Sequence, residues 1–153
     1  MQLNLTPAER TALRRAKRKQ SDLAHAEPRE IAGELSFTLQ RARELVGLAT
    51  FQSIKSIGPA FARDLIEMNI FSLDEIRDRT GAELVDEHER RLGYTTDPCV
   101  EDQFHRVLHY AHTGDNSRSW FDFTAERKAY RTEHGYPADR PTVAWHELLL
   151  AKD

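Results

Sequence analysis

The segment Ile54–Leu65, IKSIGPAFARDL, places a glycine-proline pair between two helical patterns. Proline suits the first position of a helix, because the amide that it lacks would have had no partner there. Gly58, just before the proline, is expected to adopt φ angles that other residues avoid. Ala62 keeps the second helix thin where it crosses the first, while Ile54 and Ile57 fill the inside of the corner. The segment therefore predicts two helices that meet at a tight bend.

The start of the second helix is a candidate anion-binding site. The first amides of a helix have no partner within it, and the helix dipole favours negative charge there. We expect the amides around Ser56, Gly58 and Ala60 to face water, with Lys55 and Arg63 adding positive charge. A nucleic-acid phosphate is the anion that this arrangement best fits.

The rest of the chain predicts an all-α protein, because every strong periodic pattern is helical and no alternating strand pattern competes with it. Gly47 is expected to shorten the second helix, and Gly93 and Gly135 are expected to end later ones. Residues 136–141 predict an extended connector. The expected helices cover residues 6–23, 28–49, 98–113, 124–134 and 142–152, with short helices starting at capping boxes on Ser72 and Thr80.

The charge is unevenly distributed along the chain. The net charge is −3, yet residues 1–50 hold nine Lys/Arg against six Asp/Glu, while residues 51–112 hold seven against twelve. The first helix carries most of the positive charge, and Arg14, Arg15 and Arg18 are expected to help the bend to hold a nucleic acid. A protein that bound DNA over its whole surface would be more basic.

Other classes of protein find little support in the composition. No apolar run approaches the 18 or more residues of a membrane span, and no secretory signal is recognisable. The single cysteine, Cys99, cannot form an internal disulfide and suits a reducing compartment. We therefore expect a cytoplasmic protein without a membrane partner.

The bend resembles the helix-hairpin-helix motif, whose core is an apolar residue, Pro, Gly, an apolar residue, Gly, three residues and Ala. Ile54, Ile57, Gly58 and Ala62 match this motif, and Lys55-Ser56 replaces its Pro-Gly pair. The resemblance implies a SAM-like helical bundle. It also implies a monovalent cation held by the backbone carbonyls of Gln52, Ile54 and Ile57.

A wider resemblance covers roughly residues 50–137. Together with the bend, the segments DPCVEDQF at 97–104 and WFDFT at 120–124 resemble the small bacterial "pathogenicity locus" family, sometimes labelled mitomycin-resistance proteins. The resemblance implies binding of DNA through the hairpin. It divides the chain into an N-terminal helical extension (1–49), the family domain (50–137) and a C-terminal helical tail (138–153).

Candidate catalytic groups are sparse, and no cofactor is expected. Glu101, His105, His109 and His112 share one flank of a helix, a spacing that suits either a metal site or the edge of a core. Cys99 lies in a first helical turn, where the dipole can lower a thiol pKa; the alternative is a small buried apolar residue. Base-excision glycosylases that contain this hairpin carry a catalytic lysine where this chain has Ala60. We therefore expect a protein that is not an enzyme.

Two further readings remain open. His88 falls among apolar residues and predicts a buried, hydrogen-bonded imidazole. The C-terminal aromatics either stack on unpaired bases or pin the terminal segment to the bundle; they are Trp120, Phe121, Phe123, Tyr130, Tyr136 and Trp145. The alternative to nucleic-acid binding is a protein adaptor whose hairpin is only structural, with a homodimer through Leu35, Leu39 and Val46 as one form of it.

Overall fold

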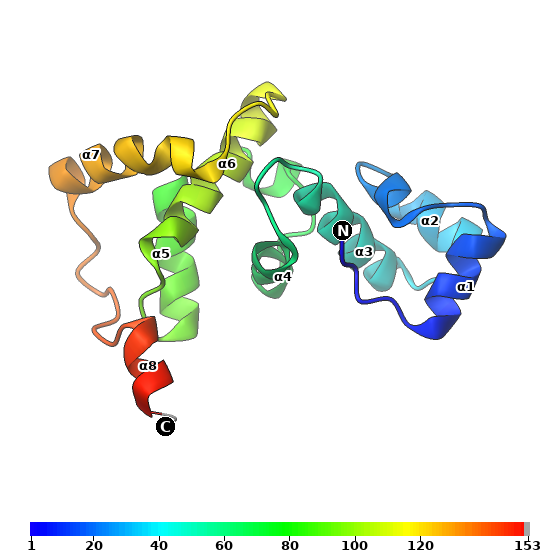
Figure 1. Cartoon of the computed structure of the whole chain (residues 1–153), viewed down its shortest axis with the longest axis horizontal. Coiled ribbons are helices and arrows are strands. Elements are labelled where there is room, and N and C mark those ends of the chain that lie inside the picture. Colours follow the sequence, from blue (N-terminus) through cyan, green and yellow to red (C-terminus); the bar gives the residue numbers. More distant parts are fainter. Residues whose placement is uncertain (152–153) are drawn as a thin grey trace. The chain divides into compact units, whose positions relative to one another are not determined.

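The computed structural model describes the backbone of residues 1–151. Every secondary-structure element that it assigns in that range is a helix (Figure 1). The predicted all-α class is confirmed. The α-helices are α1 (Pro7–Arg15), α2 (Pro28–Leu35), α3 (Leu39–Gln52), α4 (Pro59–Glu67), α5 (Gly81–Leu92), α6 (Pro98–Thr113), α7 (Thr124–His134) and α8 (Trp145–Ala151). Short 3-10 helices are η1 (Gln20–Leu23), η2 (Asp74–Ile76) and η3 (Trp120–Phe123). Each helix of residues 1–151 is too short or too polar to cross a bilayer.

The chain forms two compact units, unit 1 (residues 1–75) and unit 2 (residues 76–153). These units do not coincide with the ranges expected from sequence. The N-terminal residues share a core with the hairpin, because α2 and η1 both pack on α3. The boundary consequently falls within the expected family domain of residues 50–137.

Unit 1 is organised around α3, which packs against α2 on one side and α4 on another. Its largest fully buried side chains include Leu23, Ile31, Leu45, Phe51 and Leu65. The amphipathic spacing of α2 and α4 places Ile31 and Leu65 on the faces that meet α3.

The first helix is shorter than expected from its sequence. It begins at the predicted Thr6 cap, whose hydroxyl accepts a hydrogen bond from the Glu9 amide at 3.1 Å. It ends at Arg15 instead of Leu23 because Lys17 takes a left-handed φ of 56° and Arg18 donates its amide to the Leu13 carbonyl. Residues 20–23 then form the separate turn η1.

The helix expected over residues 28–49 is two helices. Ser36 ends α2 in the left-handed region with φ 59°, and the Thr38 hydroxyl caps α3 by accepting from the Arg41 amide. Gly47 does not shorten α3, which continues to Gln52. The left-handed residue Ser36 and the cap Thr38 break the helix although the apolar spacing continues through them. The break is visible only in the three-dimensional path of the chain.

Unit 2 has its core on α6, which packs against α5, η3 and α7. Phe104, Val107 and Leu84 are fully buried there. The predicted stops are confirmed at Gly93 and Gly135, and the predicted caps are confirmed at Thr80 and Asp97.

Other helix starts and ends differ from those expected from the sequence. Glu75 accepts the Phe71 and Ser72 amides as a capping carboxylate would, but only the short η2 follows. Thr124 is the first residue of α7 instead of its cap, because its hydroxyl donates to Asp102. The last helix starts at Trp145, where an isolated bridge joins Thr95 to Ala144; its expected end, Lys152, lies outside the described residues.

Candidate functional site

The bend between α3 and α4 is built by two buried isoleucines that flank two exposed residues. Ile54 and Ile57 retain only 1% and 5% of their accessible surface. The Ile57 amide donates to the Ile54 carbonyl at 3.0 Å and closes a turn that presents Lys55 and Ser56 to solvent. Anchoring by the isoleucines therefore determines which residues of the bend face water.

The left-handed residue of the bend is Ser56, with φ 70°, and not Gly58. Gly58 has φ −95° and ψ 179°, an extended conformation that any residue adopts. The expectation that Gly58 is needed for its φ is therefore wrong. The chain turns one residue pair earlier, at the position where the helix-hairpin-helix motif has its first glycine.

Gly58 and Pro59 form the start of α4 and leave its first amides open. No side chain caps this helix, and the Ala62 amide donates to the Gly58 carbonyl. Among the described residues, the amides of Gly58 and Ala60 donate no hydrogen bond. A Cβ built on Gly58 would find no atom within 4 Å, so the side-chain face of Gly58 at this helix start is open.

Positive side chains lie next to this helix start, with negative ones behind them. Lys55 and Arg63 are both exposed, and Arg63 shares a helix face with Ala60 because they are three residues apart. Asp64 and Glu67 follow on α4 and limit the net positive charge. The bend can thus attract one phosphate but supplies little long-range attraction.

The basic residues of the first helix are also exposed, with one exception. Arg14 and Arg15 are solvent-exposed and make no ion pair among the described residues. Arg18 instead binds both carboxylate oxygens of Glu34 at 2.8 and 2.7 Å, and this contact raises its pKa. Arg18 is therefore mainly a link between α1 and α2.

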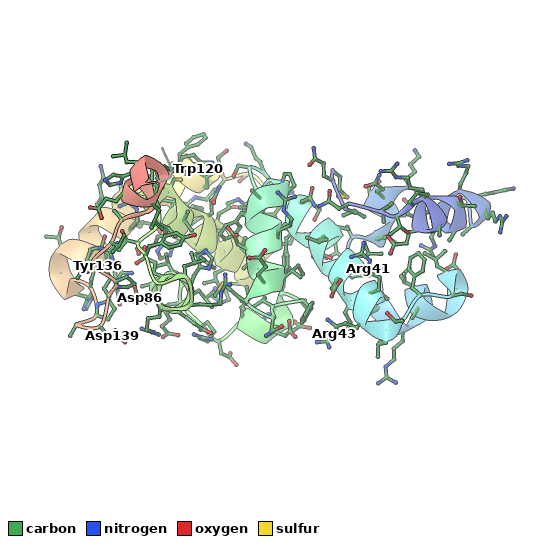
Figure 2. All side chains as sticks on the ribbon, turned by 90° about the horizontal axis from the view of Figure 1, so that it is seen from below. Arg41, Arg43, Asp86, Trp120, Tyr136 and Asp139 are labelled. Atoms are coloured by element: carbon green, nitrogen blue, oxygen red, sulfur yellow. The ribbon has the colours of Figure 1, made fainter. Side chains whose placement is uncertain are left out.

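The structure does not bring the first helix and the bend together. Figure 1 shows α3 between α1 and α4, and Figure 2 confirms this order from below. Of the predicted nucleic-acid contacts, Lys55, Ser56, Gly58, Ala60 and Arg63 gather at the bend. Arg14, Arg15 and Arg18 lie on the other side of α3.

Residues 44–129 match the family described as Pathogenicity locus. The match covers more than half of the chain, from the middle of α3 into α7. The chain belongs to the pathogenicity locus family. No curated protein and no solved structure matches the chain significantly.

The histidine flank of this pathogenicity locus protein does not form a metal site. Within residues 1–151 no group of three His, Cys, Asp or Glu residues is placed to hold a metal ion. His109 contacts Asp115 at 3.0 Å, and the Arg77 carbonyl oxygen accepts a hydrogen bond from His112 Nε2 at 2.6 Å. Burial lowers the pKa of His105, whose ring packs against Gly81.

The pKa values of the other candidate groups in the family domain are shifted by burial. Burial raises the pKa of the Cys99 thiol to about 11, and the nearby Asp97 carboxylate adds to this shift. The expected lowering by the helix dipole is therefore outweighed. His88 is buried at 2% exposure as predicted, and burial together with Arg91 lowers its pKa to about 4.

The C-terminal aromatics are divided between buried and exposed positions. Phe123 is buried, with Arg118 over its ring at 4.0 Å. Tyr136 is 44% exposed but has the guanidinium groups of Arg131 and Arg140 over its ring at 4.3 and 3.7 Å. Phe121 is 60% exposed and is the aromatic ring most accessible to a partner among those described.

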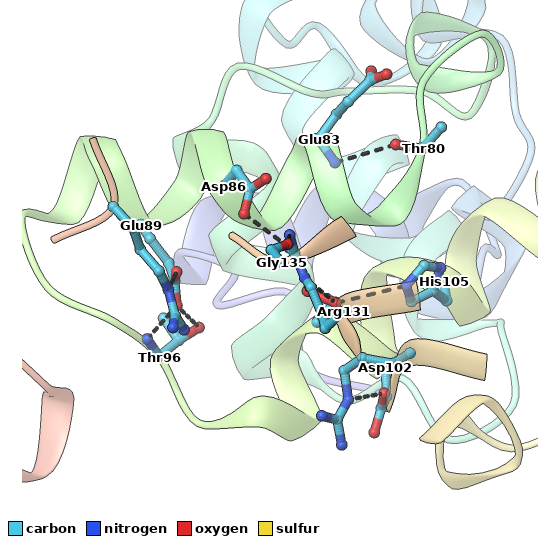
Figure 3. A network of polar contacts seen from close by, with 12 residues as sticks. Thr80, Glu83, Asp86, Glu89, Thr96, Asp102, His105, Arg131 and Gly135 are labelled. Carbon is cyan, nitrogen blue, oxygen red and sulfur yellow. Dashed lines mark hydrogen bonds and ion pairs between the residues drawn. The ribbon is translucent and has the colours of Figure 1, made fainter. Parts of the chain in front are cut away.

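Sequence reasoning missed a buried ionic network in unit 2 (Figure 3). Arg131, only 9% exposed, binds Glu101 at 2.6 Å and Asp86 at 2.8 Å. Glu89, 2% exposed, accepts from the Thr96 amide and from Arg140. Charged helical residues normally face solvent, so the sequence carries no signal for this network.

Proposed function

We propose that the protein binds the sugar-phosphate backbone of nucleic acid, DNA in particular, through the α3–α4 bend acting as a helix-hairpin-helix, and that it does so without catalysis. The observation that carries the proposal is the open start of α4. The amides of Gly58 and Ala60 have no partner among the described residues, and a side chain at Gly58 would meet no other atom within 4 Å. Lys55 precedes this helix start and Arg63 follows it, and both are exposed.

Such a site holds a phosphate and has no means of reading a base. Backbone amides and a helix dipole recognise the negative oxygen of any nucleotide, so the proposal implies little sequence preference. One or two phosphate contacts give weak, salt-sensitive binding. The monovalent cation implied for the carbonyls of Gln52, Ile54 and Ile57 remains a prediction; the Ile54 carbonyl already accepts the Ile57 amide.

The sharpest test is the substitution Gly58→Asp. Gly58 occupies the N-cap position with extended backbone angles, where aspartate is a favoured cap, so the variant is expected to keep α4 folded. Its carboxylate would occupy the open amides and repel phosphate. Gly58→Asn is the matched control, since it offers the same cap without the charge.

The measurement is fluorescence anisotropy with a labelled 20-base-pair duplex at low and at physiological salt. Loss of a phosphate contact at a helix start, together with repulsion, is expected to weaken binding by about tenfold for Gly58→Asp, and by less for Gly58→Asn. Equal affinities for the wild type and Gly58→Asp would overturn the proposal. Absence of binding by the wild type at low salt would do the same.

A protein adaptor is the second candidate, and exposed apolar side chains in unit 2 favour it. Phe121, Leu149 and Leu150 are 60%, 55% and 73% exposed. A homodimer through Leu35, Leu39 and Val46 is less well supported, because Leu35 and Val46 are each only 6% exposed. Sedimentation of the purified protein over a concentration series tests for such a dimer directly.

A further inference from the structure

A second basic surface, which we call the α1 surface, lies on α1 and the turn that follows it. It consists of Arg10, Arg14, Arg15, Lys17 and Lys19. All five side chains are exposed, and none makes an ion pair among the described residues. Arg18, in contrast, is held by Glu34.

The α1 surface borders a shallow groove of about 280 Å³ with an apolar floor. Leu5 and Leu13 form that floor, while Arg10, Arg14 and Arg18 line it. The nearest carboxylate on η1, Asp22, accepts the Lys19 amide. Glu34, Asp22 and Glu30 compensate Arg18 in this groove, whereas the five cations of the α1 surface make no ion pair among the described residues and suit a polyanion.

Specific contacts place the α1 surface at the far end of α3 from the bend. Gln2 pairs with Gln52 through two hydrogen bonds of 2.8 Å, next to the bend. Glu9 at the start of α1 binds Arg41, in the first turn of α3. From Arg41 to Gln52 the helix rises by about 16 Å at about 1.5 Å per residue.

This separation makes the two surfaces independent. The Debye length at physiological ionic strength is about 8 Å, half of the distance along α3, so neither surface adds appreciably to the field of the other. α3 also lies between α1 and α4 (Figures 1 and 2). A phosphate held at one surface therefore gains little attraction from the cations of the other.

We infer that unit 1 holds two nucleic-acid segments at once, one phosphate backbone at the bend and a second at the α1 surface. This inference rests on the proposed function of the bend and adds a second binding surface to it. The partner at each surface is a phosphodiester backbone, because both surfaces offer positive charge and hydrogen-bond donors, the groups that contact phosphates in nucleic-acid complexes. The consequence is a protein that bridges two duplexes.

The α1 surface has a distinctive signature in salt dependence. Each phosphate neutralised contributes about −0.9 to the slope of log affinity against log salt on B-DNA. Removing Arg14 and Arg15 is therefore expected to make the salt-dependence slope for binding at the α1 surface shallower by about 1.8. Gly58→Asp leaves the cations of the α1 surface in place and should leave its slope unchanged.

The test is capture of a second duplex. One 20-base-pair duplex is fixed on beads, the full-length protein is added, and a labelled second duplex is then offered. Wild-type protein is expected to retain the second duplex. Arg14→Ala with Arg15→Ala, and separately Gly58→Asp, should each still bind the fixed duplex but retain at least tenfold less of the second.

A matched control removes two exposed charges elsewhere. Arg90→Ala with Lys128→Ala takes the same charge from unit 2 and is expected to capture the second duplex as the wild type does. Wild-type protein that binds the fixed duplex without capturing another would overturn the two-segment inference and leave the proposed function intact. Wild-type protein that binds no duplex would overturn the proposed function itself.

Two further outcomes would also overturn the inference. If the Arg14→Ala, Arg15→Ala variant captures the second duplex fully, two protein copies are joining their bends and the α1 surface is not needed. If both variants weaken binding of one isolated duplex equally and the wild type captures no second one, a single duplex spans both surfaces.

Discussion

The close approach of the chain to Gly47 allows a paired prediction for two glycines that lie in helices of unit 1. A Cβ built on Gly47 would lie 2.8 Å from the Phe71 carbonyl oxygen and 2.9 Å from Ile66 Cδ1. A Cβ on Gly33, in α2, would meet no atom within 4 Å. The same change to alanine is therefore expected to have opposite effects at the two positions.

The magnitudes follow from two opposing contributions. Alanine is favoured over glycine within a helix by about 1 kcal/mol, and Gly33→Ala should keep most of this gain. At Gly47 the Phe71 backbone has to move aside, and overpacking of this kind typically costs about 1–3 kcal/mol. We expect Gly47→Ala to be about 1 kcal/mol less stable than the wild type, and about 2 kcal/mol less stable than Gly33→Ala.

Urea unfolding followed by circular dichroism measures this difference. With a slope of about 2 kcal/mol per molar urea, a difference of 2 kcal/mol separates the midpoints by about 1 M. Trp120 and Trp145 both lie in unit 2, so tryptophan fluorescence shows whether that unit unfolds at the same step. A midpoint for Gly47→Ala equal to or above that of Gly33→Ala would refute the reasoning.

Three other predictions concern unit 2. Arg131→Met leaves Glu101 buried without its cation and is expected to cost about 3–5 kcal/mol in urea unfolding. Arg90→Met, which removes an exposed pair with Asp139, should cost under about 1 kcal/mol. Burial lowers the pKa of His88 to about 4, so as the pH falls the unfolded state takes up a proton on this histidine before the folded state does. The free energy of unfolding should therefore fall as the pH drops from about 6.5 towards 4. His88→Leu should show a smaller fall over the same pH range. With a pKa raised to about 11, Cys99 should react with a disulfide reagent at pH 8 at least about tenfold more slowly than an unstructured cysteine peptide, and a faster reaction would contradict its burial.

The choice between the two candidate functions depends on what the bend contacts. Nucleic-acid binding predicts losses on Gly58→Asp, which changes one surface residue in open space. An adaptor that uses Phe121 would be insensitive to Gly58→Asp and sensitive to Phe121→Ser, since Phe121 is 60% exposed. Measuring both variants against both kinds of partner separates the two functions.

Much of unit 1 near the bend was predictable because local chemistry determines it. Pro59 suits a helix start, and the apolar spacing of α3 and α4 identifies the buried faces, including Ile54 and Ile57. The breaks at Lys17 and Ser36 were not predictable. Left-handed angles at non-glycine residues depend on the path of the surrounding chain.

The sequence by itself determined the helical class, the helix start at Pro59 and most helix caps, because periodicity, capping and turn chemistry act over a few neighbouring residues. Its motifs also carried the resemblance to the pathogenicity locus family, which the family match confirms. Only the tertiary structure decided that α1 lies across α3 from the bend, that Gly47 is required by the passing Phe71 carbonyl and that Arg131 is buried between Glu101 and Asp86. These features join residues 24 to 45 positions apart. Contacts over such separations follow from how helices pack, and a one-dimensional pattern does not record them.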